Sequence, residues 1–348
     1  MDFRFTEEQI SFRDSLKKLC EETCKTSSIR SLWNSLERLD QARWSKLIDL
    51  GVVGSLIEKD EGGLGLTDID LVLMAEESGY YALPEPLWEV ALSGSILKYI
   101  PNNNEENWKA RLANGDFFIL TCHEINKFTP NADLADAFFL QDGDGLYFAP
   151  KEEAKIIERD GLDPSQPIFE IKWKPKKSKR LMHRSESVEV WQEILNRGAL
   201  FTSAQLLGLT QKVLDLSVDY VKSREQFGRA IGSFQAVKHL LANIQVKLEF
   251  ARPVVYKAAY SLASNSSGRY RDVSYAKIVS SQVSKLASKT AIQSHGAIGY
   301  TWESDLQIFM KRIWFLDVMW GSSVWHLKRL EKEILSPSSE IGPGGTFV

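Results

Sequence analysis

The segment from Tyr220 to Gln235, YVKSREQFGRAIGSFQ, gathers residue types suited to an anionic ligand. Arg224 offers a planar guanidinium of fixed charge that matches phosphate oxygens, and Gly228 and Gly232 let the backbone approach a ligand closely. The segment also carries two amide side chains, which both donate and accept hydrogen bonds, at Gln226 and Gln235. These features predict a phosphate-binding loop. A charged connection between two helices stays open as the alternative, because a short motif depends on its context.

Helical patterns flank this segment on both sides and would hold it in place. The preceding pattern runs from Val188 to Tyr220. After the segment, apolar residues recur three and four positions apart over about five turns, at Val237, Leu240, Leu241, Ile244, Leu248, Ala251 and Val255. A polar turn at 264–268 follows, then a third helical pattern around 276–287 and a fourth at 306–316. Long helices with short connections predict a four-helix bundle over residues 186–335.

The first 113 residues also have helical periodicity. A capping-box pattern at Thr6–Gln9 opens a helix, and Thr67 or Asp68 is placed to cap another. Between them, the glycine-rich turn at 62–65 precedes a helix but follows no convincing buried strand, so it does not fit a dinucleotide-binding βαβ unit. The polar stretch PNNNEEN at 101–107 interrupts the helical pattern. Residues 1–113 are therefore predicted to form an all-helical domain.

Residues 114–185 change in character. Short runs rich in aromatic and branched residues alternate with turn residues, which predicts a small antiparallel sheet or barrel. A basic tract at 172–180 lacks interleaved aromatics for base stacking, so we interpret it as a solvated hinge. Residues 336–348, rich in Pro, Gly and Ser, are expected to be a mobile tail. The predicted fold class is α+β, mostly α.

Composition narrows the class of protein. The chain has 348 residues, enough for two or three domains, with 43% hydrophobic and 26% charged residues and a net charge of −3. No nucleic-acid partner is indicated, and no apolar run of about 18 residues or signal-peptide pattern is present, which favours a cytoplasmic protein. The three cysteines are Cys20, Cys24 and Cys122. Cys20 and Cys24 share a helix face, but with no further ligands nearby we expect buried thiols and no metal.

The order helical domain, β domain, helical bundle resembles that of acyl-CoA dehydrogenases, and specific segments match this flavoprotein family. They are FTEEQISFRDSLKKL, GGLGLTDIDLVLMAEESGYYALPEP, the loop with Y-x-x-x-R-x-Q-F-G and F-Q, and AIQSHGAIGYTWESDLQIFMKR. Each segment alone is a weak signal, but the four occur in family order over nearly the whole chain. The resemblance implies a flavin-dependent enzyme that desaturates an acyl-CoA and passes electrons to an acceptor protein.

The resemblance also implies FAD-binding residues. In this family FAD lies at a subunit interface, and the loop described first reaches the neighbouring subunit's cofactor. Arg224 would neutralise the pyrophosphate, with further contacts from Gln226, Phe227, Ile231, Phe234 and Gln235. A second turn that approaches the pyrophosphate would comprise Gln293, Gly296 and Ala297, where Ala297 replaces a family glycine and costs the backbone some closeness. Phe227 and Phe234 are equally compatible with roles as core aromatics.

The family's catalytic base is missing from this sequence. The reaction needs a carboxylate to remove the proton alpha to the thioester. The family places this glutamate in Y-E-G-T-S, which aligns with 319–323 here, so Trp320 takes its position. An indole cannot accept the proton. Some members carry the base earlier, at the position of Gly198, and the family's adjacent arginine falls on Ala199, with Arg197 one residue away. We therefore expect no catalytic residue in this chain.

The β domain also departs from the family. Its T-E-P and G-S-D loop, which contacts flavin and substrate, is absent, and LTCHE runs directly into NKFTPNADL. His123 or Glu124 would be the nearest replacement bases, but a satisfied or solvated polar residue is the better interpretation because nothing else of a pocket surrounds them.

Retention of the flavin loop together with loss of the base resembles one subunit of the heteromeric, α2β2 acyl-CoA dehydrogenases of bacterial sterol side-chain catabolism. The hypothesis is a partner subunit that lends FAD-binding residues, while a second acyl-CoA dehydrogenase-like chain supplies the glutamate in a heterotetramer. By analogy alone, the substrate would be a bulky acyl-CoA such as a steroid side-chain thioester. Two alternatives remain: a homomeric enzyme with a displaced base such as Glu124 or Asp317, and a non-catalytic binding or scaffold protein.

Overall fold

The computed structural model describes residues 4–33, 35, 37–100, 107–143, 145–176 and 179–336. The chain divides into two compact units, each made of segments that are distant in the sequence. The first comprises Met1–Thr26, Leu71–Leu83 and Ala199–Val348, and the second comprises Ser27–Asp70 and Pro84–Gly198. The tail predicted at 336–348 lies outside the described residues apart from Ser336, as do residues 101–106 of the polar break. The three domains proposed in chain order stay a prediction.

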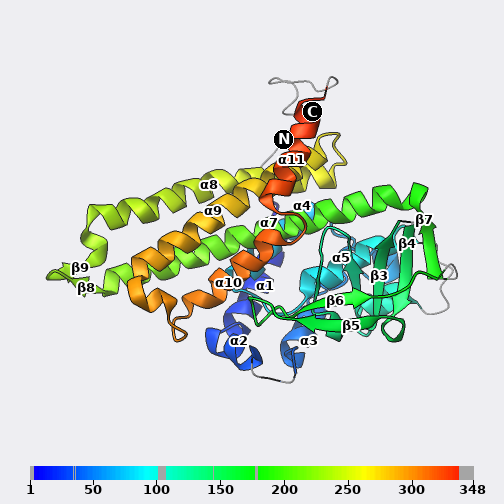
Figure 1. Ribbon diagram of the computed structural model, residues 1–348, viewed down its shortest axis with the longest axis horizontal. Coiled ribbons are helices and arrows are strands. Elements are labelled where there is room, and N and C mark those ends of the chain that lie inside the picture. Colours follow the sequence, from blue (N-terminus) through cyan, green and yellow to red (C-terminus); the bar gives the residue numbers. More distant parts are fainter. Residues whose placement is uncertain are drawn as a thin grey trace. The chain divides into compact units, whose positions relative to one another are not determined.

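The first unit is helical. α1 (Glu7–Thr23) begins at the predicted capping box: the Thr6 hydroxyl accepts from the N–H of Gln9, whose side chain accepts from the N–H of Thr6. Two helices are shared with the second unit, α4 (Asp68–Tyr80) and α7 (Arg184–Ser223). The remaining helices are α8 (Gln235–Ala263), α9 (Arg269–His295), α10 (Leu306–Val318) and α11 (Ser323–Ile334). α8 packs along α9, which also contacts α10 and α11 (Figure 1).

The apolar stripe of α8 is buried for most of its predicted length. Leu241, Ile244, Leu248, Ala251 and Val255 lie in the core, and on the facing helix so do Ala276, Val283 and Ala287. Leu240 is a correction to the prediction, because its side chain is 42% exposed. One residue turns a helix by about 100°, so Leu240 points further toward solvent than its neighbour Leu241. Apart from this edge, the predicted helical bundle is confirmed, and α11 extends it.

The second unit combines short helices with two small sheets. Its helices are α2 (Thr26–Trp33, whose first residue belongs to the first unit), α3 (Gln41–Asp49), α5 (Leu87–Leu97) and α6 (Trp108–Ala113). Its strands are β1 (Ile119–Cys122), β2 (Thr129–Pro130), β3 (Ala137–Asp142), β4 (Gly145–Pro150), β5 (Lys155–Arg159), β6 (Ile168–Lys172) and β7 (Arg180–His183). One-turn 3₁₀ helices lie at Lys59–Glu61, Ala132–Leu134 and Lys151–Glu153. The predicted mixture of helix with a small β region is confirmed.

One strand pair departs from the predicted antiparallel sheet. The four-stranded sheet has the order β1-β3-β4-β7, and β1 runs parallel to β3, with Thr121 beside Phe139. The three-stranded sheet, β2-β6-β5, is antiparallel throughout. The chain leaves β1, passes through β2 in the other sheet, and returns to β3 in its original direction, as a parallel pair requires. Periodicity along one strand cannot show that detour.

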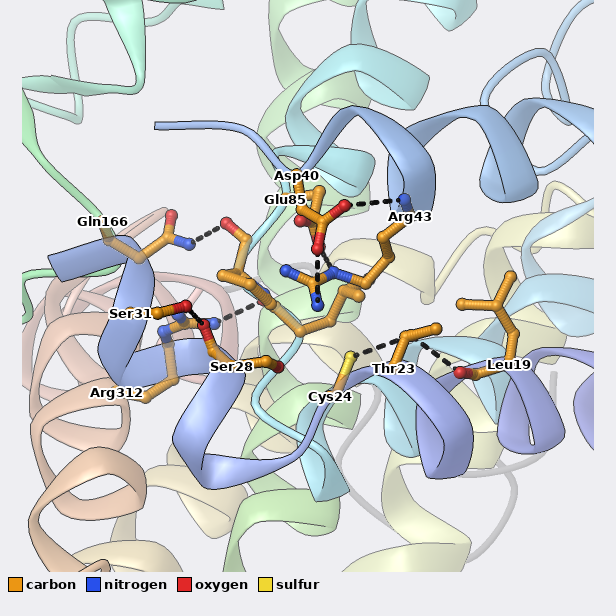
Figure 2. Close-up of polar contacts among 12 residues, drawn as sticks. Leu19, Thr23, Cys24, Ser28, Ser31, Asp40, Arg43, Glu85, Gln166 and Arg312 are labelled. Atoms are coloured by element: carbon orange, nitrogen blue, oxygen red, sulfur yellow. Dashed lines mark hydrogen bonds and ion pairs between the residues drawn. The ribbon is translucent and has the colours of Figure 1, made fainter. Parts of the chain in front are cut away.

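A buried ion pair fixes α3 to the Pro84–Pro86 turn. The guanidinium Nε of Arg43 lies 2.7 Å from Glu85 Oε2, with both side chains 1% exposed. Figure 2 shows that the Asp40 carboxylate points back to the N–H of Arg43, which caps α3. Burial raises the pKa of Glu85, and the neighbouring Arg43 opposes this shift. Each partner of such a pair needs the other, since a lone buried charge is strongly destabilising.

Candidate functional site

The segment between α7 and α8 forms a tight hairpin. β8 (Glu225–Gln226) pairs with β9 (Arg229–Ala230), and the turn between them holds Phe227 at φ 55° and Gly228 at φ 75°. Two successive positive φ values are typical of a type I′ turn. The Arg224 N–H donates to the Tyr220 carbonyl, and the Arg224 carbonyl accepts from Ile231, so the arginine is held at the base of the hairpin. A 3₁₀ turn at Ile231–Ser233 then leads into α8.

The polar side chains predicted to bind the cofactor all face solvent. Arg224, Gln226 and Gln235 are exposed, and in the part of the chain that the structure describes none of these side chains has a hydrogen-bond or ion-pair partner. An arginine without an internal carboxylate is suited to an anion supplied from outside. Their positions fit a diphosphate group brought by another molecule.

An aromatic cluster forms the apolar side of the hairpin. Phe227 is 91% exposed and lies edge-on to Phe234, with ring centroids 6.2 Å apart. The Arg229 guanidinium stacks over the Phe234 ring at 4.1 Å from its centroid. Ile231 and Phe234 are half-buried. Sequence reasoning did not single out Arg229. The available signal was its place directly after Gly228, since a residue that follows a tight glycine turn lies beside the turn.

The second predicted element lies at the end of α9, within the same unit. Gln293, Gly296 and Ala297 are all exposed, and a 3₁₀ turn spans Gly296–Tyr300. Its link to the hairpin is a stack of the Tyr220 and His295 rings, with centroids 4.3 Å apart and planes 17° from parallel. This contact places the end of α9 beside the end of α7, and sequence reasoning assigned no role to His295.

His295 is half-buried where it stacks on Tyr220. Burial lowers its pKa, and its Nδ1–H donates to the Ala291 carbonyl over 2.8 Å. The residue that follows, Gly296, is also open to an incoming ligand: a Cβ there would meet nothing within 4 Å, and the same is true at Gly228. An approaching diphosphate would therefore meet bare backbone in both turns. The exposed donors and these open glycines fit the pyrophosphate of FAD.

The position predicted to lack the catalytic glutamate has a very different environment. Trp320 lies between α10 and α11 at φ 56°, followed by Gly321 at φ 92°, and its side chain is buried at 5% exposure. The Trp320 carbonyl accepts from Nε2 of His326 over 3.0 Å. Nδ1 of the same imidazole lies 3.1 Å from the Ser274 hydroxyl. Because burial lowers the pKa of His326 to about 3, the ring is neutral, with the proton on Nε2.

Two lysines of α9 anchor the end of α10. Lys277 is fully buried and donates to the Leu316 carbonyl over 2.5 Å, and burial lowers its pKa to about 7. Lys285 lies 3.1 Å from Asp317 and 3.4 Å from the Ser323 hydroxyl. Asp317, one of the alternative bases, is therefore the partner of a lysine. The turn that would carry the family's glutamate is held by internal contacts.

The other positions considered for a catalytic base, or for the arginine beside it, lie in α7 and next to β1. Gly198 and Ala199 are buried within α7. Arg197, in the second unit, places Nε and Nη2 on the two carboxylate oxygens of Asp68 at 2.7 and 3.0 Å. His123 is buried, which lowers its pKa to about 4, and Glu124 is exposed while its backbone N–H donates to Gln141.

The cysteines are buried or half-buried thiols, and lysines of the basic tract form ion pairs with nearby glutamates. Cys20 and Cys24 are buried thiols, and Cys24 lies 3.8 Å from the Thr23 hydroxyl (Figure 2). Among the described residues no group of three or more His, Cys, Asp or Glu side chains is arranged to hold a metal. In the basic tract, Lys172 pairs with Glu170, and Lys176 pairs with Glu153 at 3.0 Å. No helix in the described ranges is long and apolar enough to cross a membrane.

Comparison with known proteins gives matches over most of the chain. Residues 6–116 match the acyl-CoA dehydrogenase N-terminal domain, and residues 188–335 match the acyl-CoA dehydrogenase C-terminal domain. Among curated relatives, the acyl-CoA dehydrogenase IpdE2 of Mycolicibacterium smegmatis is 27% identical over 330 residues, covering 94% of this chain and 99% of its own length. The chain and this relative are thus similar from end to end.

Solved structures show the same fold. The ChsE4–ChsE5 complex from Mycobacterium tuberculosis contains a chain that superposes with a TM-score of 0.85 at 20% identity, covering 97% of this chain and all of that one. A variant of the Tcur3481–Tcur3483 steroid ACAD superposes with a TM-score of 0.84 at 18% identity over 94% of this chain and 97% of that one. The two matched domains cover most of the chain and agree with the fold: the chain belongs to the acyl-CoA dehydrogenase family of FAD-dependent acyl-CoA oxidoreductases.

Proposed function

We propose that this chain is one subunit of a heteromeric acyl-CoA dehydrogenase. It lends flavin-binding residues across the interface, and a second family chain supplies the catalytic glutamate and most of the acyl-CoA pocket. One observation carries the proposal. The polar side chains proposed to bind flavin, Arg224, Gln226 and Gln235, are exposed and have no hydrogen-bond or ion-pair partner among the described residues, whereas Trp320 is buried at the position that aligns with the family's base.

The desaturation removes the alpha proton of an acyl-CoA thioester with a carboxylate while hydride leaves the beta carbon. FAD, when bound, accepts that hydride. Trp320 offers an N–H donor and no basic atom. Asp317 is already paired with Lys285 at 3.1 Å within this chain. These observations support a base from the partner chain.

This chain's own residues would bind and orient the cofactor. Arg224 would neutralise the pyrophosphate, with Gln226 and Gln235 donating or accepting around it. Phe227, Phe234 and Ile231 would cover the adenosine side. At the end of α9, Gln293 would hydrogen-bond the diphosphate region, and Gly296 and Ala297 would leave room for it to reach the backbone. None of these groups takes part in proton transfer.

The proposed substrate is a bulky acyl-CoA of the steroid side-chain class. Support comes from the similarity to a steroid ACAD and to the ChsE4–ChsE5 complex, both of which are named as two-chain assemblies. The assembly would be a heterotetramer with one flavin site in each pair of unlike chains, and an electron-transfer protein would reoxidise the flavin.

The decisive experiment is co-expression with an acyl-CoA dehydrogenase-like chain of the same genome that keeps the family's glutamate, followed by measurement of FAD per chain. We expect one FAD for each pair of unlike chains and none on this chain alone. Arg224→Ala should reduce flavin retention at least tenfold, because a charge-assisted contact to phosphate is lost. Lys222→Ala is the matched control, since it removes an exposed positive charge two residues away, and it should retain flavin.

Two results would overturn the proposal. One FAD bound to each chain expressed alone would indicate a homomeric enzyme, and no flavin in either preparation would indicate a non-catalytic scaffold. A further variant, Trp320→Phe, should leave turnover of the complex nearly unchanged. A large loss of turnover there would mean that this chain lines an active pocket.

A further inference from the structure

The register of the β8–β9 hairpin places four side chains on one of its faces. Along a strand, side chains alternate between the two faces, and residues paired across an antiparallel ladder share a face. Gln226 pairs with Arg229, and the Ile231 N–H donates to the Arg224 carbonyl, which continues the same ladder. The residues of the shared face are therefore Arg224, Gln226, Arg229 and Ile231. Three of them are predicted FAD ligands, and Arg229 is the fourth residue of that face.

The carboxylate of the hairpin lies on the opposite face. Glu225 stands between Arg224 and Gln226 in the strand, so alternation directs its side chain away from theirs. Arg224 and Arg229 are both exposed, and within the described ranges neither has a hydrogen-bond or ion-pair partner, Glu225 included. The face thus presents two guanidinium charges that no carboxylate of the described residues neutralises.

The Phe234 ring holds the Arg229 guanidinium in place. The guanidinium carbon lies 4.1 Å from the ring centroid, and Phe234 is itself in edge contact with Phe227. An arginine that lies over an aromatic face keeps the N–H donors at the edge of its plane available for a ligand. A donor group that is already oriented also loses less conformational freedom when it binds. Arg229 is therefore prepared to bind an anion.

The start of α8 adds positive partial charge beside this ring. Phe234 is the N-cap of α8, and no side chain caps the helix. The N–H groups of a first helical turn have no partner inside the helix, and together with the helix dipole they attract anions. Figure 1 shows the β8–β9 hairpin at this end of α8. The helix terminus and the two arginines therefore favour a ligand of the same charge.

A diphosphate matches a pair of arginines better than a single one. It carries a negative charge on each phosphate, and Arg224 supplies only one positive charge. Arg224 and Arg229 lie on a diagonal of the ladder. Residues on such a diagonal are roughly 7–8 Å apart, which long side chains can bridge. Two guanidinium groups at this separation can bind adjacent phosphates through charge-assisted hydrogen bonds.

We propose that Arg229 is a further cofactor-binding residue, which binds the second phosphate of FAD beside Arg224. The inference rests on the proposed function and extends the diphosphate contact from one arginine to a pair. Phe234 orients the Arg229 guanidinium, and Gln226 lies between the two arginines on the same face.

The test titrates FAD into the co-expressed complex after its flavin has been removed, and flavin fluorescence gives the Kd. Arg229→Ala should weaken FAD binding about tenfold, because a charge-assisted contact to phosphate is lost. Arg229→Lys keeps the charge but not the planar contact with Phe234, so it should weaken binding about threefold. Glu225→Gln is the matched control on the opposite face, and it should change the Kd less than twofold. Thermal melts of the variants check that the fold is kept.

Competition against FAD separates a phosphate contact from an adenine contact. In the Arg229→Ala complex, ADP should compete about tenfold more weakly than in the unmodified complex, and adenosine should compete equally well in both. Equal weakening of ADP and adenosine would assign the guanidinium to the adenine ring and overturn the proposal. Unchanged FAD affinity in Arg229→Ala would overturn it too, as would a larger effect of Glu225→Gln than of Arg229→Ala.

The outcomes separate this inference from the proposed function. If Arg224→Ala loses flavin and Arg229→Ala binds it as tightly as the unmodified complex, the inference is wrong and the proposed function stands. If this chain binds its own FAD when expressed alone and Arg229→Ala weakens that binding, the heteromeric function is wrong and the arginine pair stands. Absence of flavin from every preparation would overturn both.

Discussion

Two turns of the helical unit have the same backbone and opposite surroundings. In the hairpin, Phe227 and Gly228 have φ values of 55° and 75°, and between α10 and α11, Trp320 and Gly321 have φ values of 56° and 92°. Each is an aromatic residue followed by glycine, both in the left-handed region. Phe227 is nevertheless 91% exposed, whereas Trp320 is 5% exposed. The local conformation does not decide whether such a turn binds something outside the chain or closes on the interior.

The difference lies in what packs behind each turn. A Cβ added to Gly228 would meet no atom within 4 Å, whereas one added to Gly321 would lie 2.9 Å from His326 Nε2 and 3.0 Å from Trp325 Cε3. Beside the first turn, the exposed side chains of Arg224 and Gln226 have no hydrogen-bond or ion-pair partner among the described residues, whereas the second turn satisfies its own carbonyl through His326.

The largest expected effect is on the buried turn. His326→Ala removes a fully buried ring together with its hydrogen bond to the Trp320 carbonyl and its contact with the Ser274 hydroxyl, so we expect a loss of about 3 kcal/mol in the free energy of unfolding. Arg224→Ala, in the exposed hairpin, should change it by less than about 0.5 kcal/mol. Urea unfolding of the purified chain measures both. Equal losses for the two variants would mean that the turns do not differ in their structural role.

A pH-dependent effect of intermediate size should arise at Lys277. Burial lowers its pKa from 10.5 to about 7. Between these values the unfolded chain binds more protons at this residue than the folded chain, so the free energy of unfolding rises with pH. From pH 7 to pH 9 the contribution should be about 2 kcal/mol, and Lys277→Met should lack it. Urea unfolding at both pH values provides the measurement, and an unchanged pH dependence in the variant would contradict a buried, shifted lysine.

The smallest effect compares one substitution in both turns. Gly228→Ala costs only the strain of a left-handed alanine, about 1 kcal/mol. Gly321→Ala has the same strain and also a close contact with the His326 and Trp325 rings, so it should cost about 1 kcal/mol more. Denaturant midpoints of the two variants give the difference. A larger loss of stability for Gly228→Ala than for Gly321→Ala would contradict the difference in packing, because it would mean that atoms lie close to Gly228.

Most helices of the fold could be predicted, because each depends on local signals. The capping box at Thr6 and the apolar period of α8 are contained in consecutive residues, and both are confirmed. The parallel pairing of β1 with β3 was not predicted, because it depends on a detour through another sheet. α11 was not predicted either, although Ser322 caps it through its hydroxyl. Its sequence, SVWHLKRLEKEI, is short and mostly polar, and a helix of this length depends on packing against α9.

The candidate site also combines residues that the sequence predicted with side-chain contacts that only the structure showed. Sequence comparison placed Arg224 and Gln235 in a flavin loop and found Trp320 at the base position, because these are matters of residue identity at a fixed spacing. The stack of Arg229 on Phe234 and that of Tyr220 on His295 were not foreseen, since each pairs side chains brought together by a turn or by packed helices. The roles of the predicted cofactor residues stay predictions until flavin binding is measured.

The sequence by itself determined the family, the order of helical and β segments, the presence of the flavin loop and the absence of glutamate at 320. These properties follow from residue types and their spacing, which do not depend on distant contacts. Only the tertiary structure decided which way each turn faces and which apolar side chains of α8 are buried or exposed. Burial, hydrogen-bond partners and charge pairing depend on residues up to tens of positions away, such as His326 and Ser274, and only the folded chain brings them together.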